Sequence, residues 1–268
     1  MTDTLDFALS LARKAGELIV HERKTATLSR EYKNGNELVT NVDLKADRLI
    51  CDAISQAYPD HFILSEESSP ELGNIQELDA SVWVIDPIDG TVNFAHGLGH
   101  SAISIAHVEN GNFEVGVVFN PFTNEMFSAR KGEGALLNGS AIEVAHESEL
   151  SRAIIATGFP YDKSAMEPLV KRLRVVLNNC ADIRRIGSAA LDICYLAAGR
   201  LDGYYESLSI WDHAAAQLIA KEAGAKYGHF SDVPDGVDPQ FHNEDFLISN
   251  PVLYPKLLSL LQSAAASE

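Results

Sequence analysis

The chain has 268 residues and a formal net charge of −17 at pH 7, and 46% of its residues are hydrophobic. This length and hydrophobic content suffice for a large core, and we expect one unit spanning residues 1–268. The acidity argues against a nucleic-acid surface, and the chain has no eighteen-residue apolar run and no signal-peptide pattern, so we expect no direct nucleic-acid partner and no membrane contact. Cys51, Cys180 and Cys194 match no metal-ligand spacing, so we expect reduced thiols and a cytoplasmic protein.

The first elements of the chain are two helices and a short strand. Apolar residues at helical spacing predict an amphipathic helix over residues 3–22. A second helix is expected from Leu44 to Tyr58, with Asp43 as its N-cap. Residues 62–64 then form a short apolar strand, which places the carboxylate of Glu66 at a strand end.

The stretch that follows contains the densest group of candidate ligands. The apolar residues before Asp86 predict a buried strand that ends there, and Pro87 forbids further ladder pairing. Asp86, Asp89 and the inward carbonyl of Ile88 are hard oxygen ligands that suit a divalent ion. A helical turn beginning at Gly90-Thr91 would aim unpaired N–H groups at an anionic group beside that ion.

A simpler interpretation of the same stretch is an Asp-Pro turn followed by an Asp-Gly turn. Asp-Gly alone would favour that interpretation. The complete run, with an apolar strand before it and Thr91-x-Asn93-Phe94 after it, favours a functional site.

The remaining sequence predicts two sheets. In the N-terminal half, about residues 1–150, period-two alternation over residues 102–130 with a turn at Asn110-Gly111 predicts an antiparallel sheet. In the C-terminal half, about residues 151–268, strands and helices alternate, which predicts layered α and β structure. The expected strands are 153–157, 183–186, 203–206 and 246–249, and the expected helices are 166–178, 188–198, 212–223 and 251–262.

Two segments resemble the signatures of the inositol monophosphatase family. The first is Asp86-Pro-Ile-Asp-Gly-Thr-Val-Asn-Phe94, and the second is Trp211-Asp-His-Ala-Ala-Ala216 followed by Glu222-Ala-Gly224. The resemblance implies an α/β fold, an alternating α-β-α-β-α sandwich, usually as a homodimer. It also implies a Mg²⁺-dependent, lithium-sensitive phosphatase with two or three ions per site. The acidity agrees with metal dependence, because a carboxylate-lined site repels a phosphate ester unless cations are bound there.

The resemblance assigns roles to individual residues. The implied metal ligands are Glu66, Asp86, the Ile88 carbonyl, Asp89 and Asp212, with Asp43 acting through waters. Glu66 and Thr91 would pair to activate the attacking water, so the catalytic set is Glu66, Thr91 and Asp43. The implied substrate contacts are Asp89, Gly90, Thr91, Gly187, Ser188, Ala189, Glu206 and Lys33.

Several residues have a plain structural alternative. Asp43 is also a good N-cap, and Lys33, beside the glycine-containing segment 34–36, is also a typical solvated loop lysine. Arg184-Arg185 suits salt bridges at a strand end. His96 and His100 are four residues apart, but the glycines between them disfavour the continuous helix that a shared zinc would need.

The sequence departs from the family in the loop after Glu206. Four residues separate Glu206 from Trp211, one fewer than in the best-known members, which puts specificity for inositol in question. We expect inositol 1-phosphate as substrate. The alternatives are fructose-1,6-bisphosphatase, histidinol phosphatase or nucleotide 3′-phosphatase activity, or a non-catalytic factor bound to the transcription or ribosome machinery.

Overall fold

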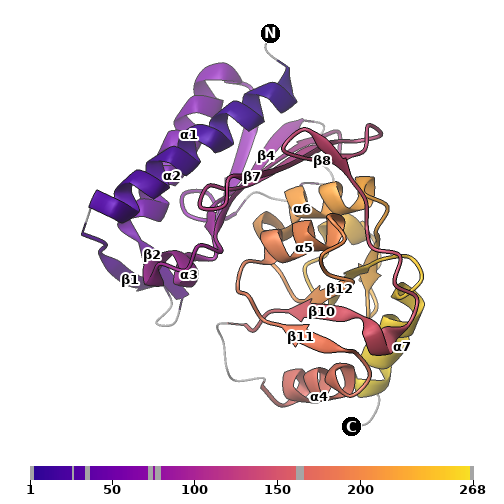
Figure 1. Ribbon diagram of the computed structural model, residues 1–268. Helices are drawn as coiled ribbons and strands as arrows, with labels where there is room; N and C mark the ends of the chain where they lie inside the picture. The colour runs from indigo at the N-terminus through magenta and orange to yellow at the C-terminus, as the bar shows by residue number, and fades with distance from the viewer. Residues whose placement is uncertain are drawn as a thin grey trace.

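The computed structural model describes residues 3–25, 27–33, 37–71, 75, 80–160 and 166–265. Figure 1 shows five layers that alternate helices and sheets, as the resemblance implied. Helices α1 and α2 cover the outer face of a seven-stranded sheet, α5 and α6 fill the middle, and a five-stranded sheet is backed by α4 and α7. None of the described helices is long and apolar enough to cross a bilayer.

The first two layers come from the N-terminal half. Helices α1 (Thr4–Thr25) and α2 (Asn41–Ala57) pack on the large sheet. The chain segment that joins the two helices contains β1 (Arg30–Lys33) and β2 (Glu37–Thr40), which form a separate two-stranded sheet. The large sheet has the strand order β3-β4-β5-β6-β7-β8-β9, and all its pairs except β3–β4 are antiparallel. Its strands are β3 (Phe62–Ser65), β4 (Ser81–Asp89), β5 (Ala102–Glu109), β6 (Asn112–Asn120), β7 (Glu125–Arg130), β8 (Ala135–Leu137) and β9 (Ser140–Ile142).

This sheet is buried on both faces. Successive side chains of a strand point to opposite faces, so Val82 and Val84 join the core around α5 and α6 while Trp83 and Ile85 join the core around α1 and α2. All four side chains are at most 1% exposed. The double burial fixes the register of β4 and therefore the position of the acidic turn at its end.

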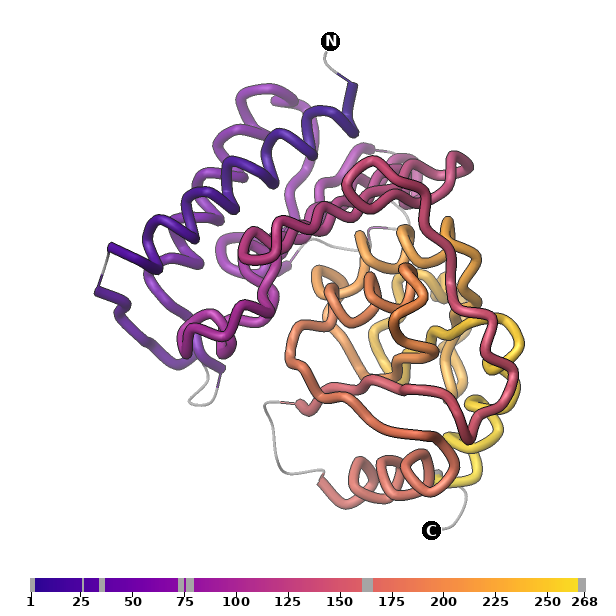
Figure 2. Tube along the Cα trace, in the orientation of Figure 1, coloured from indigo at the N-terminus to yellow at the C-terminus, as the bar shows by residue number. Residues whose placement is uncertain are grey.

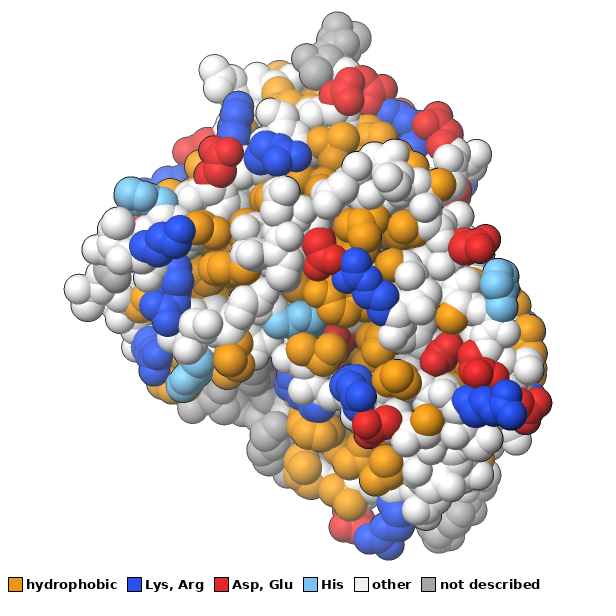
Figure 3. Space-filling view, viewed as in Figure 1, with side chains coloured by type: hydrophobic (Ala, Val, Ile, Leu, Met, Phe, Trp, Pro, Cys, Tyr) orange, Lys and Arg blue, Asp and Glu red, His pale blue; other side chains and the backbone are white. Residues whose placement is uncertain are grey.

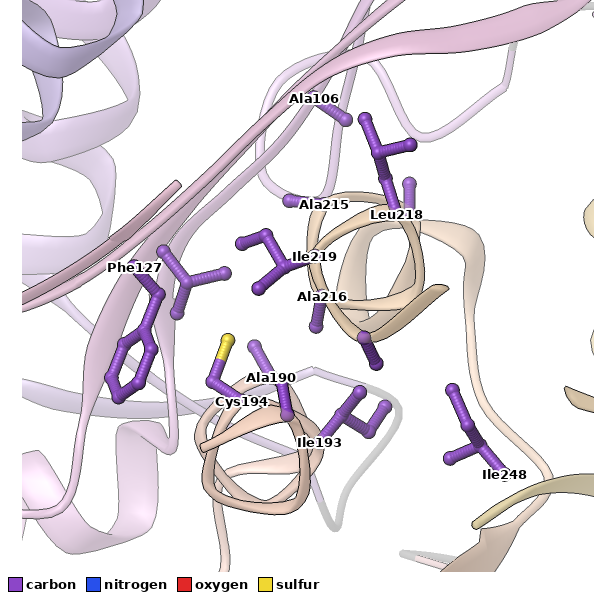
Figure 4. Packing of buried hydrophobic residues seen from close by; sticks show 14 of the residues in the cluster. Ala106, Phe127, Ala190, Ile193, Cys194, Ala215, Ala216, Leu218, Ile219 and Ile248 are labelled. Atoms are coloured by element: carbon purple, nitrogen blue, oxygen red, sulfur yellow. The ribbon is translucent and has the colours of Figure 1, made fainter. Parts of the chain in front are cut away.

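The middle layer is built from small side chains. Helices α5 (Ala189–Ala197) and α6 (Ile210–Glu222) pack against each other and against the large sheet, and Figure 4 shows Ala216 on the side of α6 toward α5 and Ala215 on its side toward the sheet. Gly116 of β6 lies so close to α6 that an added Cβ would come within 2.6 Å of the Ala215 carbonyl oxygen. This close packing holds the start of both helices against the acidic turn.

The C-terminal layers are a second sheet and the two helices that cover it. The second sheet has the order β11-β10-β12-β14-β13, and the chain trace in Figure 2 passes into it from the first sheet through residues 143–153. Its strands are β10 (Ile154–Thr157), β11 (Asp182–Arg184), β12 (Gly203–Glu206), β13 (Lys226–His229) and β14 (Phe246–Ser249). Helices α4 (Met166–Leu177) and α7 (Tyr254–Ala265) cover its outer face.

The predicted elements in these layers are confirmed, with several corrections. Thr40, not Asp43, is the N-cap of α2, and Asp43 is the third residue of the helix. Strand β4 does not end at Asp86, because pairing with β5 resumes at Asp89 after an irregularity that contains Pro87. Strands β1, β9 and β13 were not predicted; they are short and contain no buried residue, so they show no alternation of buried and exposed side chains.

Candidate active site

Three carboxylates from distant parts of the chain converge at the junction of the two halves. Asp86 and Asp89 come from the end of β4, and Asp212 is the third residue of α6. Each contributes one carboxylate oxygen, and these three oxygens all lie within 4.8 Å of one another. Only the packing of α6 on the large sheet brings them together, because 123 positions separate Asp89 from Asp212.

Local hydrogen bonds aim these carboxylates. Asp86 Oδ1 accepts the backbone N–H of Ile88 at 3.0 Å, which folds the turn back on itself. Asp89 Oδ2 accepts the hydroxyl of Ser188 and the backbone N–H of Ala190 (2.8 Å), so it sits at the N-terminus of α5, where a negative charge is favoured. Asp89 therefore ties the first sheet to the middle helices.

The electrostatics of the cluster are unfavourable without a cation. Burial and the charges of Glu66, Asp89 and Asp212 raise the pKa of Asp86 well above its usual value. Burial, opposed by the bonds from Ser188 and Ala190, leaves the pKa of Asp89 at about 6. Burial and the charge of Glu67 raise the pKa of Glu66 to about 8. Such a set is neutralised either by protons or by metal ions.

Thr91 pairs with Asp43. Gly90 is the left-handed N-cap (φ 89°) of the short helix α3 (Thr91–His96), as the sequence predicted for this turn. The Thr91 hydroxyl lies 2.9 Å from Asp43 Oδ1 and 3.0 Å from the Ile88 carbonyl oxygen. The other oxygen of Asp43 accepts the Thr40 backbone N–H at 3.0 Å, which fixes the carboxylate beside Thr91. The joint action of Thr91 and Glu66 on a water stays a prediction.

Lys33 lies at the end of β1 and not in a loop. Its Nζ is 2.6 Å from the Glu67 carboxylate, an almost fully buried side chain. Segment 34–36 lies outside the described residues. Glu67 therefore faces the lysine while Glu66 contacts Asp86, because adjacent side chains point to different sides of the chain.

Two cavities adjoin at this cluster. The first, about 270 Å³, holds the acidic side and is lined by residues that include Glu37, Glu66, Asp86, Ile88, Thr91 and Trp211. The second, about 280 Å³, extends toward α5 and is lined by residues that include Asn93, Phe159, Arg185, Gly187, Ala189, Asp192 and Tyr204. Six residues line both: Asp89, Gly90, Phe159, Glu206, Leu208 and Asp212. They are two ends of one cleft.

The second cavity is rich in hydrogen-bonding groups. Glu206 is fixed by the Tyr204 hydroxyl, and burial raises the pKa of Glu206 to about 7. Gly158 has no room for a side chain, because an added Cβ would lie 1.8 Å from Glu206 Oε2. Asp192 is 1% exposed and lies 3.2 Å from His100 Nε2. These carboxylates are acceptors for hydroxyl groups.

Most of the predicted site residues therefore line one cleft. Asp43 and Lys33 line neither of its two cavities; Asp43 contacts Thr91, and Lys33 contacts Glu67. Sequence reasoning missed Gly158, Asp192 and Tyr204. Asp192 and Tyr204 fit helical or strand patterns and carry no local motif, and only Gly158-Phe159-Pro160, a turn after a strand, could have indicated a loop at the site. His100 pairs with Asp192, and among the described residues no metal-type cluster includes it. Arg184 pairs with Asp182 at the strand end, whereas Arg185 lines the second cavity.

The donor set fits a hard divalent cation. The acidic side offers several carboxylates and the Ile88 carbonyl, the oxygen ligands that Mg²⁺, Mn²⁺ and Ca²⁺ prefer. The charge of Lys33 lowers the pKa of Glu66, but the Lys33 ammonium is already paired with Glu67. A metal is thus the partner that these carboxylates lack.

Known proteins resemble this chain over almost its whole length. A model of the inositol monophosphatase family matches residues 1–266. The Nus factor SuhB of Pasteurella multocida is 38% identical over 273 aligned residues, which cover 100% of this chain and 99% of that protein. The solved Thermotoga maritima IMPase superposes with a TM-score of 0.86 at 35% identity and covers 98% of both chains. The inositol monophosphate-bound SaIMPase-II gives a TM-score of 0.80 at 28% identity and covers 95% of this chain and 91% of that one.

Proposed function

The chain belongs to the inositol monophosphatase family, and from this membership and the carboxylate cleft we propose that it is a Mg²⁺-dependent phosphatase of small phosphate monoesters, with inositol 1-phosphate as the first candidate substrate. The observation that carries the proposal is the convergence of Asp86, Asp89 and Asp212 on one point beside a cavity rich in hydroxyl acceptors. A phosphatase scaffold explains both halves of the cleft.

We assign Glu66, Asp86, the Ile88 carbonyl, Asp89 and Asp212 to hold two or three Mg²⁺ ions. When bound, Mg²⁺ supplies Lewis-acid polarisation and charge neutralisation for the phosphoryl group. The reaction then needs one attacking water on phosphorus and departure of the alcohol oxygen on the opposite side. The products are the free alcohol and inorganic phosphate.

The protein's own groups position that water. Asp43 Oδ1 accepts the Thr91 proton, so a lone pair of Thr91 Oγ1 is free to accept a hydrogen bond from the water. Glu66, at the same end of the cleft, completes the orientation of the water. We assign the backbone N–H groups of Gly90 and Thr91 to the phosphate oxygens. Gly90 adopts a left-handed conformation (φ 89°) in this turn, which glycine adopts without strain.

The second cavity receives the alcohol. We assign Glu206 as the acceptor for a polyol hydroxyl, with Gly187, Ser188 and Ala189 beside it. The short loop after Glu206 is tied down, because the Leu208 N–H donates to the Asn243 carbonyl at 2.8 Å. Lys33 acts through Glu67 in this account, because its ammonium is held there.

The test is phosphate release from inositol 1-phosphate, fructose 1,6-bisphosphate, histidinol phosphate and adenosine 3′,5′-bisphosphate, with Mg²⁺ and with EDTA. We expect Mg²⁺-dependent release with inositol 1-phosphate preferred, and none from an Asp86→Asn variant that folds normally. Preference for another ester would move specificity to the loop after Glu206. No release from any ester would overturn the proposed activity.

Three finer expectations accompany this proposal. Lithium should inhibit the Mg²⁺-dependent activity, and light scattering should detect a homodimer. Fractionation of the source cells should recover the protein in the cytoplasm. Insensitivity to lithium would weaken the assignment to inositol phosphates within the family without affecting the metal-dependent phosphatase.

A second candidate function rests on the relatives named Nus factor SuhB. That name points to an interaction with the transcription machinery, the alternative named from the sequence, and it weighs against the expectation of no direct nucleic-acid partner. Lys and Arg are interspersed with Asp and Glu on the face seen in Figure 3, so we propose contact through a protein partner. Retention of purified transcription complexes by both the wild type and Asp86→Asn would support this function, and no retention by either would contradict it.

A further inference from the structure

Asp47 is a buried carboxyl group with no role in the site described so far. It lies on α2 one turn after Asp43, so both acids are on the same face of the helix. Asp47 is 5% exposed, and among the described residues no Lys, Arg or His forms an ion pair with it. A buried carboxyl group without an ion pair is costly unless hydrogen bonds satisfy it.

The partners of Asp47 are neutral donors, two of them in one turn. Its Oδ1 accepts the Ser65 hydroxyl at 2.5 Å and the Ser68 hydroxyl at 3.1 Å, and the Cys51 thiol lies at 3.6 Å. Burial and the Asp47 charge raise the pKa of Cys51 to about 12, so the thiol keeps its proton and remains a donor. Three donors therefore converge on one carboxyl oxygen.

The two serines bracket Glu66. Ser65 ends β3, and its backbone pairs with Ser69 through two hydrogen bonds of 3.0 and 3.1 Å. The Glu66 N–H reaches the Ile85 carbonyl at 3.2 Å on β4. Asp47 holds the turn from the α2 side, opposite to the contact with β4.

We propose that Asp47 is a positioning residue for Glu66: its carboxyl group clamps the Ser65–Ser68 turn and sets the Glu66 carboxylate for metal binding. The effect of Asp47 on metal binding and catalysis rests on the proposed function. Its structural role in holding the Ser65–Ser68 turn is independent of that function. Helix α2 then serves both catalytic loops, holding Thr91 through Asp43 and the Glu66 turn through Asp47. Groups that orient a metal ligand in this way commonly change metal affinity about 10- to 100-fold when removed.

The test compares Asp47→Ala with Ile50→Val, a control that loosens the same helix without touching the turn. Hydrogen exchange measures the clamp without any metal, and calorimetry measures Mg²⁺ binding. We expect faster exchange of the peptide containing residues 65–69 and an Mg²⁺ Kd raised about tenfold in Asp47→Ala only. Asp47→Asn, which keeps an acceptor oxygen, should lie between the wild type and Asp47→Ala in both readouts.

The outcomes separate the two proposals. If the wild type binds Mg²⁺ and turns over phosphate esters while Asp47→Ala matches Ile50→Val in exchange and Kd, the clamp is wrong and the function stands. If exchange at residues 65–69 accelerates but the wild type hydrolyses no ester, the clamp stands and the phosphatase does not. Should Asp47→Ala fail to fold, Ser65→Ala and Ser68→Ala remove the donors, and unchanged exchange in both would overturn the clamp.

Discussion

Asp43 and Asp212 occupy the same position in two different helices. Each is the third residue of its helix, and each accepts the backbone N–H of the residue three positions earlier, from Thr40 at 3.0 Å and from Ser209 at 2.9 Å. One oxygen of each carboxylate caps its helix; the other oxygen of Asp43 accepts the Thr91 hydroxyl, and Asp212 belongs to the carboxylate cluster. The fold therefore uses helix capping to orient two acids of the candidate site.

This double role predicts different effects for two substitutions of Asp212. Asp212→Asn keeps an oxygen for the Ser209 N–H and removes one of the repelling charges, so the metal-free protein should melt at a temperature equal to or above that of the wild type. Asp212→Ala also loses the cap and should be destabilised by about 1 kcal/mol relative to Asp212→Asn. Both should lose Mg²⁺-dependent turnover.

The measurements are thermal melting in EDTA and phosphate release in Mg²⁺. Equal melting temperatures for the two variants would contradict the capping role of Asp212. Turnover within about tenfold of the wild type in Asp212→Asn would remove Asp212 from the metal site.

The sequence predicted most of this architecture because its patterns are strong. The apolar strand before Asp86 and the helical spacing in α1, α5 and α6 led to correct elements, and the Asn110-Gly111 turn is followed by the predicted hairpin partner. Short exposed strands such as β9 were missed, because they are defined by their pairing and not by a side-chain pattern.

The site was predictable where a motif is local and not where packing creates it. Asp86, Asp89 and Thr91 lie within one turn, so their proximity follows from the sequence alone. The contact of Asp192 with His100 joins residues 92 positions apart, and it depends on α5 docking against the loop before β5. The spacing of residues along the sequence cannot predict such a contact.

The carboxylate cluster predicts an unusual pH dependence of stability. Burial raises the folded-state pKa of Glu66 from 4.5 to about 8, so the folded protein holds more protons than the unfolded chain between these values. The free energy of unfolding must then fall as the pH rises through this window. In EDTA we expect the melting temperature to be at least about 4 °C lower at pH 8 than at pH 5.5.

Mg²⁺ should reverse this trend. Because the ion binds the ionised carboxylates, its stabilising effect should grow with pH. The measurement is a set of melting curves at pH 5.5, 7 and 8 with EDTA or excess Mg²⁺. A melting temperature in EDTA that rises steadily from pH 5.5 to pH 8 would contradict the raised pKa values.

The contact of β6 with α6 predicts a stability defect in Gly116→Ala. The new methyl group would overlap the Ala215 backbone, which cannot move without displacing α6. Overpacking of this kind costs about 1–3 kcal/mol, which corresponds to a fall of about 2–4 °C per kcal/mol in a chain of this size.

Gly99→Ala is the matched control for that variant. Its methyl group would meet only the exposed side chain of Phe122, at 3.3 Å, which can give way. Equal melting temperatures for the two variants would show that the β6–α6 contact tolerates a methyl group and that the helix is not fixed by it.

The close approach of Gly158 to Glu206 predicts that Gly158→Ala changes the substrate specificity and leaves the metal site intact. In Gly158→Ala the methyl group would occupy the space of the Glu206 carboxylate, which must move away from the second cavity. A lost hydrogen bond to a charged acceptor costs about 1.5–3 kcal/mol, so kcat/KM for inositol 1-phosphate should fall at least about tenfold. Release from p-nitrophenyl phosphate, which has no polyol hydroxyls, should change by less than about threefold.

Glu206→Gln separates position from charge. It keeps the shape of the side chain and the contact with Tyr204, so its effect reports the carboxylate charge alone. If Gly158→Ala lowers kcat/KM equally for both esters and weakens Mg²⁺ binding, the substitution has disturbed the acidic side of the cleft, and Glu206 is not the specificity contact. If only the inositol ester is affected, and Glu206→Gln has a smaller effect of the same kind, the position of Glu206 selects the alcohol.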